Sequence, residues 1–524
     1  MKRFVALAGL LSVVACATAG APAVPPPTPP APPDLRGTLV VVATDADGDP
    51  VPGARVDVSA TENTDDGVTD GNGYWSRQLA QGVIDWEVHA DGYAQAAGAA
   101  RLVGPADVVV RVHATLARTA PPRRHGLVRA CGRAFCDDDG EFNALGASLF
   151  WMAWGEAHDP ARLDANLAWL AREAHVDYVR ALSMVGAQPY WHDRVIDPNA
   201  PDHFDVLRRA TRRAWDRYGI RVQWTLFADA QVMRPRDREA YVRQAMAVVN
   251  ELGPAVFSVE VANEYWQNGF EPAELRRLTA LARSLTDRPV ASSAPGPGFD
   301  CQPDIEDAYR GDVADFGTPH FDRTYWENGW RPVRQPWEWQ FCGAAPEAFA
   351  QNEPIGPQSS VASETDPAKI QAAYVTGLLS GSGAYVFHTD AGIRGDRDIW
   401  NDPGAALAAR WLAVAREALP PGLANWERFN HHWPGHPFAG SLNDQIVPDG
   451  AREGVVRAFA AGTGRFVVAP IGIVGRARLT ARAPMHVIVH NPATWAPLLE
   501  RDLAAGETLT LEGREYVVIT GEYR

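Results

Sequence analysis

The chain has 524 residues, of which 64 are acidic and 49 basic, giving a formal net charge of −15. This length exceeds what one hydrophobic core usually supports, so we expect two to four domains, and the acidic balance disfavours nucleic acid as a partner. The chain also contains 18 tryptophans. Several of them lie in polar, glycine-rich contexts, where a flat aromatic face suits a sugar ring.

The N-terminus has the features of an export signal. Two basic residues precede an apolar stretch over residues 4–14, which is too short to span a membrane and predicts a signal peptide over residues 1–16. The segment Val-Val-Ala-Cys that ends at Cys16 resembles a bacterial lipobox, and this resemblance implies that Cys16 is lipidated. The alternative is an ordinary signal peptide cleaved near residues 17–20. We expect an exported bacterial lipoprotein in the periplasm, outer membrane or cell surface, attached to the membrane only through Cys16.

A proline-rich tether over residues 17–36 leads into an all-β segment over residues 37–117. Its strand-like runs are separated by Asp-Gly and Asn-Gly turn signals and cover residues 39–43, 54–59, 83–89 and 108–113. The motifs Gly48–Ala54, Thr69–Tyr74 and Gly92-Tyr93 resemble the carboxypeptidase regulatory-like sandwich. The resemblance implies a structural or spacer module, because that fold has no general chemistry.

Between residues 125 and 424 the pattern changes to strands that alternate with amphipathic helices. The strand-like runs cover residues 145–151, 176–182, 220–227, 255–262, 289–293, 313–318, 349–352 and 384–388. Eight such runs with helices between them predict an α/β fold, a (β/α)8 TIM barrel. Residues 319–347 are rich in Trp, Pro and Gly, so we expect a long loop at the active face instead of a regular sixth helix.

The last hundred residues return to an all-β pattern. Strand-like runs cover residues 454–460, 465–471, 485–490, 508–511 and 516–520. They predict a C-terminal β-sandwich domain over residues 425–524 that packs on the barrel. The expected architecture is therefore a barrel flanked by an N-terminal and a C-terminal β-sandwich.

Two glutamates follow predicted barrel strands. Glu264 comes directly after the fourth strand, next to Asn263, and Glu353 follows the seventh strand in a Pro-Ile-Gly context. Catalytic groups of such barrels lie where strands end and loops begin. Two carboxylates in one barrel are what glycoside hydrolysis requires: one protonates the leaving oxygen, and the other attacks the anomeric carbon or activates water.

The barrel resembles the clan A glycoside hydrolases, the retaining superfamily that includes cellulases and β-galactosidases. The residues that carry the resemblance are Asn263-Glu264 at the end of strand four, Glu353 at the end of strand seven and Arg180 in strand two. The resemblance implies that Glu264 is the acid/base, Glu353 the nucleophile, and Asn263 a contact to the sugar's 2-hydroxyl. It also implies that Arg180 steadies the nucleophile.

The chain departs from the clan pattern after strands six and eight. His320 is followed by Phe-Asp where the clan often has His-x-Tyr, so the tyrosine that commonly touches the nucleophile is missing, and Tyr325 is a candidate substitute. Strand eight ends in His388-Thr-Asp390 where the clan often has a tryptophan, so we expect His388 or Asp390 to line the pocket and Trp400 to supply the flat face.

Tryptophans also follow other predicted strands. Trp154 comes after the first strand and Trp266 after the fourth. Each alone fits core packing as well as a platform, but their shared position after strand ends favours stacking on sugars. With His320, they are the remaining expected substrate contacts.

Four cysteines remain after Cys16. They are Cys131, Cys136, Cys301 and Cys342. An even number in an exported chain favours two disulfides, and of the three possible pairings we favour the one between near neighbours. A metal site is less expected, because no Cys-x-x-Cys pair or flanking histidine cluster accompanies them.

The sequence thus predicts a retaining glycosidase that acts on a poly- or oligosaccharide and needs no cofactor or metal. The motifs for a serine-hydrolase elbow, a zinc protease or a phosphate loop are absent from the sequence. Two alternatives stay open, a non-catalytic surface lipoprotein that binds polysaccharide and an envelope transglycosylase. The sugar, its linkage, endo or exo action and the oligomeric state are not predicted, although the long loop after strand six favours exo action or short oligosaccharides.

Overall fold

The structure is a computed structural model of the whole chain. It describes residues 36–45, 50–51, 53–60, 63–90, 93–104, 108–116, 124–187, 189–191, 194–295, 304–323, 329–357, 363–428, 438–439, 455–460, 463–473 and 476–524. The predicted signal peptide, Cys16, most of the tether, Cys301 and Tyr325 lie outside these residues. In the described ranges, the structure contains no helix with the length and apolar character needed to cross a membrane.

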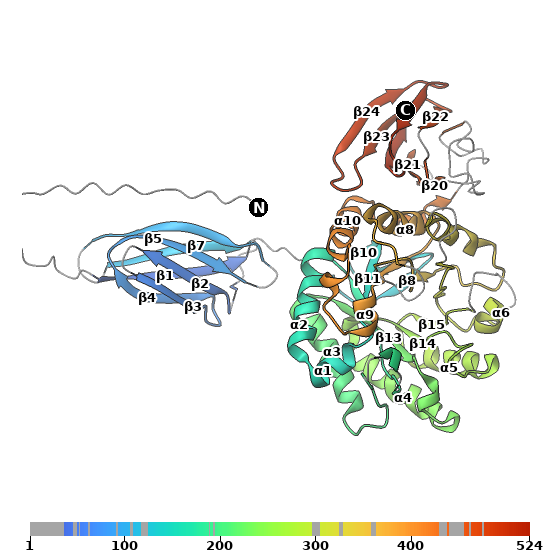
Figure 1. The fold of residues 1–524 in the computed structure, drawn as a ribbon, viewed down its shortest axis with the longest axis horizontal. Helices are drawn as coiled ribbons and strands as arrows, with labels where there is room; N and C mark the ends of the chain where they lie inside the picture. The colour runs from blue at the N-terminus through green and yellow to red at the C-terminus, as the bar shows by residue number, and fades with distance from the viewer. Residues whose placement is uncertain are drawn as a thin grey trace, which may run out of the picture. The chain divides into compact units, whose positions relative to one another are not determined.

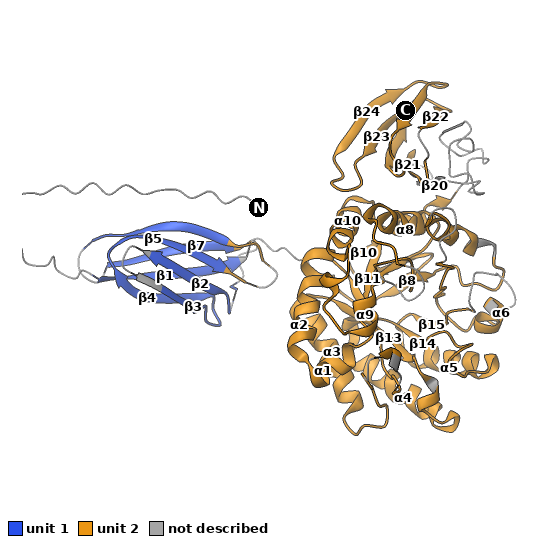
Figure 2. Cartoon of the chain, in the orientation of Figure 1, with its two compact units in different colours: residues 1–88, 96–115 blue, residues 89–95, 116–524 orange. Residues whose placement is uncertain are grey.

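The chain divides into two compact units (Figure 2). The first comprises residues 1–88 and 96–115, and the second residues 89–95 and 116–524. The second unit therefore contains the α/β region together with the C-terminal strands that the sequence assigns to a separate domain.

The first unit consists of two sheets, in which β1 pairs antiparallel with β4, β2 with β3 and β5 with β6. Their orders are β4-β1-β7 and β3-β2-β5-β6. The strands are β1 (Arg36–Asp45), β2 (Arg55–Ala60), β3 (Asn63–Val68), β4 (Tyr74–Ala80), β5 (Gly82–His89), β6 (Ala96–Leu102) and β7 (Val108–Leu116). Alternate residues of β5 are buried, among them Ile84 and Val88, and both sheets contribute side chains such as Leu39 and Val56 to the interior.

The second unit is built on a curled parallel sheet of seven strands in the order β15-β14-β13-β12-β11-β17-β16. The strands are β11 (Ala144–Ser148), β12 (Tyr178–Leu182), β13 (Arg221–Phe227), β14 (Val256–Ala262), β15 (Val290–Ser293), β16 (Ala350–Gln351) and β17 (Ala384–Phe387). Every residue of these strands is buried, as expected for a parallel sheet that is covered on both faces.

The predicted sixth strand is reduced to two bridged residues. Phe316 pairs with Ala291 of β15 and Gly317 with Phe349 beside β16, so this segment links the two edges of the sheet. The run ends early because Pro319 has no N–H to continue a ladder. Gly317 has no room for a side chain, since a Cβ there would lie 2.4 Å from Trp339 Cζ2.

Helices lie between the strands along the chain and cover the sheet (Figure 1). They are α1 (Met152–His158), α2 (Pro160–Trp169), α3 (His203–Tyr218), α4 (Pro235–Leu252), α5 (Pro272–Leu285), α6 (Asp304–Tyr309), α7 (Arg331–Arg334), α8 (Pro367–Leu379), α9 (Asp390–Arg394) and α10 (Ala405–Ala418). Helix α3 ends at Gly219, which adopts a left-handed φ of 67°.

The predicted loop over residues 319–347 is partly helical. It contains α7, which continues into a 3-10 helix over Gln335–Phe341. Trp330, Val333, Trp337 and Trp339 are buried there, so their apolar surface packs against the rest of the unit. The high Trp and Pro content conceals this periodicity, which is why the sequence predicts a loop.

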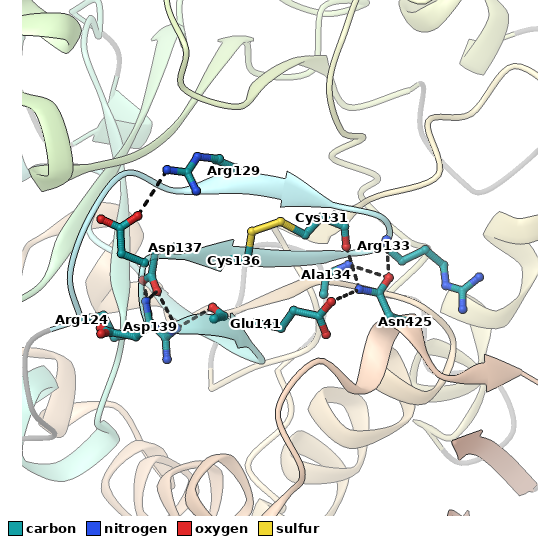
Figure 3. The surroundings of a disulfide bond; sticks show 12 residues. Arg124, Arg129, Cys131, Arg133, Ala134, Cys136, Asp137, Asp139, Glu141 and Asn425 are labelled. Carbon is teal, nitrogen blue, oxygen red and sulfur yellow. Dashed lines mark hydrogen bonds and ion pairs between the residues drawn. A yellow bond between two sulfur atoms is a disulfide. The ribbon is translucent and has the colours of Figure 1, made fainter. Parts of the chain in front are cut away.

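A small antiparallel sheet covers the N-terminal ends of the barrel-like strands. It comprises β8 (Arg129–Cys131), β9 (Ala134–Asp137) and β10 (Gly140–Phe142), and a disulfide joins Cys131 to Cys136 (Figure 3). The ring of Phe135 lies 4.9 Å from that of Phe257 in β14 and 5.3 Å from that of Phe316, so it closes this end of the sheet.

The C-terminal strands form two further sheets. A six-stranded sheet has the order β18-β20-β21-β26-β23-β24, and a three-stranded sheet has the order β19-β22-β25. The strands are β18 (Glu427–Arg428), β19 (Phe438–Ala439), β20 (Val455–Ala460), β21 (Arg465–Pro470), β22 (Arg476–Ala481), β23 (Met485–His490), β24 (Pro497–Leu503), β25 (Thr508–Glu512) and β26 (Val518–Tyr523).

Helix α8 lies between the parallel sheet and the six-stranded C-terminal sheet (Figure 1). Because it is covered on both sides, nearly all its residues are buried. Gln371 in this helix donates from Nε2 to the carbonyl of Pro492, at 2.8 Å, and thus ties the helix to the C-terminal strands.

The buried ion pair below the sheet gives a stability prediction. Asp137 accepts hydrogen bonds from Arg221, at 2.9 Å, and from Arg124, at 2.7 Å, and its side chain is fully buried. Replacing Asp137 with Ala leaves buried positive charge without a partner, so we expect Asp137→Ala to lower the free energy of unfolding by about 3–5 kcal/mol in urea unfolding. The exposed pair of Asp237 with Arg234 provides the control, because Asp237→Ala should cost about 1 kcal/mol or less. Equal costs would contradict the prediction.

Candidate active site

Glu264 lies where β14 ends and the following turn begins. Its backbone has a φ of 38°, an unusual left-handed conformation for a residue other than glycine. The amide of Tyr265 donates to Ser293 Oγ at 3.0 Å, and Asn268 donates to the carbonyl of Asn263, which holds this turn in place. The strained turn therefore fixes the position of Glu264 at the end of a rigid strand.

The carboxylate of Glu264 has polar partners. Its Oε1 lies 3.0 Å from His320 Nδ1, and Gln267 Nε2 donates to its Oε2. The side chain is 18% exposed, whereas that of Glu353 is 7% exposed. Of the two glutamates, Glu264 is thus the one that is more open to solvent.

Glu353 follows β16 and is surrounded by cationic or imidazole groups. Arg180 donates from Nη1 to its Oε1 at 2.8 Å. Its Oε2 lies 3.3 Å from Arg323 Nη2, 3.6 Å from His320 Nδ1 and 3.8 Å from His388 Nε2. The structure therefore brings Arg180, His320 and His388, three of the predicted site residues, to this carboxylate.

The charges around Glu353 determine its protonation state. Burial by itself would raise the pKa of Glu353, but His320, Arg180 and Arg323 together hold the pKa well below the usual range of a glutamate. The two guanidinium groups keep their charge at every relevant pH. Glu353 is therefore ionised at neutral pH.

The two predicted catalytic carboxylates approach each other. One ligand atom from each of Glu264, His320 and Glu353 lies within 4.8 Å of the other two. Two carboxyl groups that retain configuration stand about 5–5.5 Å apart, and those that invert it stand about 6.5–9.5 Å apart. A separation of at most 4.8 Å between one oxygen of each carboxylate is well below that of an inverting pair and close to that of a retaining pair.

These three residues could also be considered as metal ligands, since a histidine and two carboxylates suit a divalent ion. However, both oxygens of Glu353 already face a guanidinium group, Arg180 on one side and Arg323 on the other. A cation at this point would be repelled by both arginines, so we assign no metal to the cluster.

Arg180 is fully buried and connects the elements of the site. It donates from Nε and Nη2 to Glu260 Oε2, at 3.1 and 2.7 Å, from Nη2 to Asn263 Oδ1 at 2.8 Å, and from Nη1 to Glu353. These bonds join β12 to β14 and to the end of β16. A single guanidinium thus sets the position of both Asn263 and Glu353.

Glu260 is a residue of the site that the sequence interpretation missed. It is fully buried in β14 and also accepts hydrogen bonds from Thr225 Oγ1, at 2.7 Å, and Asn352 Nδ2, at 3.0 Å. The single charged residue in the buried Val256–Ala262 run was the available signal, because it needs a buried partner. Arg323 was also missed, and its sequence context gives no such signal.

His388 is the buried imidazole behind Glu353. Its Nδ1 lies 2.7 Å from Ser148 Oγ at the end of β11. Burial lowers the pKa of His388 well below its usual value, and although Glu353 opposes this, Arg323, Arg180 and His320 add to it. His388 is therefore neutral, whereas Asp390, the alternative pocket residue, pairs with Arg397 at 2.9 Å and Arg394 at 3.0 Å.

The predicted aromatic contacts lie in different surroundings. Trp266 is 40% exposed just beyond Glu264. Arg194 lies over the ring of Trp154, at 5.0 Å from its centroid. The Trp400 ring packs 5.9 Å from Trp169 of α2. The exposed ring of Trp266 is therefore accessible to a sugar, whereas the ring of Trp400 packs against a residue of helix α2.

Comparison with known proteins shows which fold this is. No family model and no curated protein sequence matches the chain. A solved structure assigned to the glycoside hydrolases from Bacteroides vulgatus ATCC 8482 matches with a TM-score of 0.52 at 14% identity, over 94% of this chain and 99% of that one. A glycoside hydrolase family 5 structure from the same organism gives a TM-score of 0.53 at 11% identity, over 76% and 93% of the two chains. Another glycoside hydrolase gives 0.54 at 11% identity, over 76% and 96%. The chain therefore shares the fold of these three structures.

The buried imidazole gives a pH prediction. A histidine whose pKa is lower in the folded than in the unfolded protein lowers stability as the pH falls below about 6.5, because the unfolded chain then binds more protons. In His388→Gln this contribution is absent, so between about pH 6.5 and 5 the free energy of unfolding should fall less steeply, by up to about 1.4 kcal/mol per pH unit.

Urea unfolding at several pH values measures these slopes. His203, whose pKa burial lowers to about 4, is present in both proteins and does not affect the comparison. The exposed His158 provides the control, since His158→Gln should leave the slope unchanged. Identical slopes for His388→Gln and the parent protein would show that His388 is not held neutral.

Proposed function

We propose that this protein is a retaining glycoside hydrolase that cleaves a poly- or oligosaccharide through a covalent glycosyl-enzyme intermediate. The observation that carries the proposal is the approach of the Glu264 and Glu353 oxygens to within 4.8 Å in a chain with a glycoside hydrolase fold. In this proposal the curled sheet, with residues 316–317 in sixth place, is a (β/α)8 barrel of the clan A type.

In the first step Glu353 acts as the nucleophile. One of its oxygens bonds to the anomeric carbon while the bond from that carbon to the leaving oxygen breaks, and Glu264 donates its proton to that oxygen. The low pKa of Glu353 keeps it ionised for this attack. Glu264, with its greater exposure, lies where a leaving group and water have access.

In the second step Glu264 acts as a base. It takes a proton from water, the water oxygen bonds to the anomeric carbon, and the ester bond to Glu353 breaks to restore the carboxylate. Two inversions give overall retention of configuration. No cofactor enters either step.

Asn263 positions the substrate in this scheme. Its Oδ1 accepts a hydrogen bond from Arg180, and within the described part of the chain its Nδ2 has no acceptor, so it can donate towards the sugar. This arrangement supports the contact to the 2-hydroxyl that the clan A resemblance implies.

The remaining parts of the chain complete the proposal. We infer that the protein is exported and anchored through Cys16, with the first unit as a spacer between the membrane and the catalytic unit. Such an arrangement suits an enzyme that meets a polysaccharide outside the cytoplasm.

Globomycin, which blocks processing of lipidated precursors, should cause the precursor to accumulate, whereas Cys16→Ala should no longer label with palmitate.

Removal of either carboxylate tests the chemistry. The parent protein is first screened against 4-nitrophenyl glycosides and polysaccharides for nitrophenolate or reducing-end release. On a substrate found in this screen, Glu353→Ala and Glu264→Ala should each lower kcat by several orders of magnitude, because each removes one half of the acid and nucleophile pair. Glu347→Ala, at an exposed glutamate near β16, is the matched control and should keep its activity.

Azide distinguishes the two roles. As a small nucleophile that needs no base, azide should restore turnover of Glu264→Ala on activated aryl glycosides and give a glycosyl azide of retained configuration. The same anion should give an inverted azide with Glu353→Ala. Proton NMR of the products reads the configuration, and the same product from both variants would contradict the assigned roles.

A further inference from the structure

Arg323 lies against Glu353, but the two proposed steps give it no role. Its side chain is only 6% exposed, and its Nη2 lies 3.3 Å from Glu353 Oε2. Among the described residues Glu353 is its only carboxylate partner, and its Nη1 is buried without a hydrogen-bond acceptor. Arg323 thus places a full positive charge beside Oε2 of Glu353.

The neighbouring charges explain why a second arginine is needed. Arg180 divides its hydrogen bonds between Glu353 and the fully buried Glu260, so these three groups together carry one negative charge. Net charge is costly to bury. Addition of Arg323 makes the cluster of Arg180, Glu260, Arg323 and Glu353 neutral, and the buried imidazole of His388 adds no charge at neutral pH.

The charge balance changes during the proposed reaction. When Glu353 becomes an ester, its negative charge is lost, and the cluster is left with one positive charge. When water then bonds to the anomeric carbon and the ester bond breaks, the electron pair returns to Glu353, and the water proton goes to Glu264. A positive cluster favours this return, because the developing carboxylate meets charge that is already in place.

We propose that Arg323 is a positioning residue that neutralises the Arg180–Glu260–Glu353 cluster and draws the electron pair back onto Glu353 when the glycosyl-enzyme is hydrolysed. This inference rests on the proposed function. Besides Arg180 and Arg323, the groups that face Glu353 are His320 and His388, with Glu264 across the site. The phenolic hydroxyl that the clan pattern has after its histidine would donate a hydrogen bond but no charge, so Arg323 gives this site a different balance between the two steps.

The first test separates the two chemical steps. With the aryl glycoside that the parent protein turns over fastest, Arg323→Met should hydrolyse the intermediate more slowly. We expect kcat and KM to fall together by about 10- to 100-fold, with kcat/KM nearly unchanged and a burst of nitrophenolate before steady state. Arg323→Lys keeps the charge and should recover most of kcat, and Arg236→Met, at an exposed arginine, should match the parent.

A structural loss would look different. If Arg323→Met lowers kcat/KM as much as kcat, with no burst, the effect is on the first step or on folding, and the proposal is overturned. If the parent protein releases no sugar or aryl group from any glycoside, the proposed function fails first, before any Arg323 variant is compared.

A second measurement does not depend on activity. Urea unfolding midpoints of Arg323→Met, Glu353→Gln and the double variant form a cycle at pH 7. If the pair is real, the double variant should lose less than the sum of the two single losses, because removing the second partner relieves the unpaired charge left by the first. Additive losses would overturn the proposed contact even if the enzyme is active.

Discussion

The site depends on one buried guanidinium. Arg180 extends from the middle of the sheet with no exposure to solvent, and every donor that it directs at a neighbour reaches Glu260, Asn263 or Glu353. An arginine is suited to this place because its planar fork holds two carboxylates in fixed directions. Its charge can be buried only because Glu260 balances it. The strand that precedes Glu264 and the segment that carries Glu353 are therefore held in place by the same ion cluster that keeps Glu353 ionised.

Much of the fold can be predicted from the hydrophobic periodicity of the sequence. Helices and buried strands alternate from Leu145 to Phe387 in the sequence. In the parallel sheet, the strands that were predicted as neighbours lie side by side. The sequence interpretation was wrong where local composition conceals the periodicity. Pro319 shortens the sixth strand to two bridged residues, and the Trp- and Pro-rich segment that follows forms α7 and a 3-10 helix. Short strands such as β18 and β19 also escaped notice, because two residues carry no alternation.

The candidate site was predictable where a residue sits at a strand end. Asn263, Glu264 and Glu353 were identified in this way, and the structure brings Arg180, His320 and His388 to the same carboxylate. Glu260 had a signal in the sequence, because a charged residue within a buried strand needs a partner, whereas Arg323 had none, because its role arises from charges that meet only after folding. Asp390 illustrates the converse, since its carboxylate is taken by Arg394 and Arg397.

The central claim is that a sugar becomes covalently attached to Glu353. Treatment with dinitrophenyl 2-deoxy-2-fluoro glycosides of the sugars that the protein accepts slows the second step more than the first, so the intermediate accumulates. Mass spectrometry of the intact protein and of its peptides then locates the label. Our account predicts that the mass rises by one fluorosugar, located on the peptide that contains Glu353. A label on any other residue, or no label on a protein that hydrolyses the unsubstituted glycoside, would contradict it.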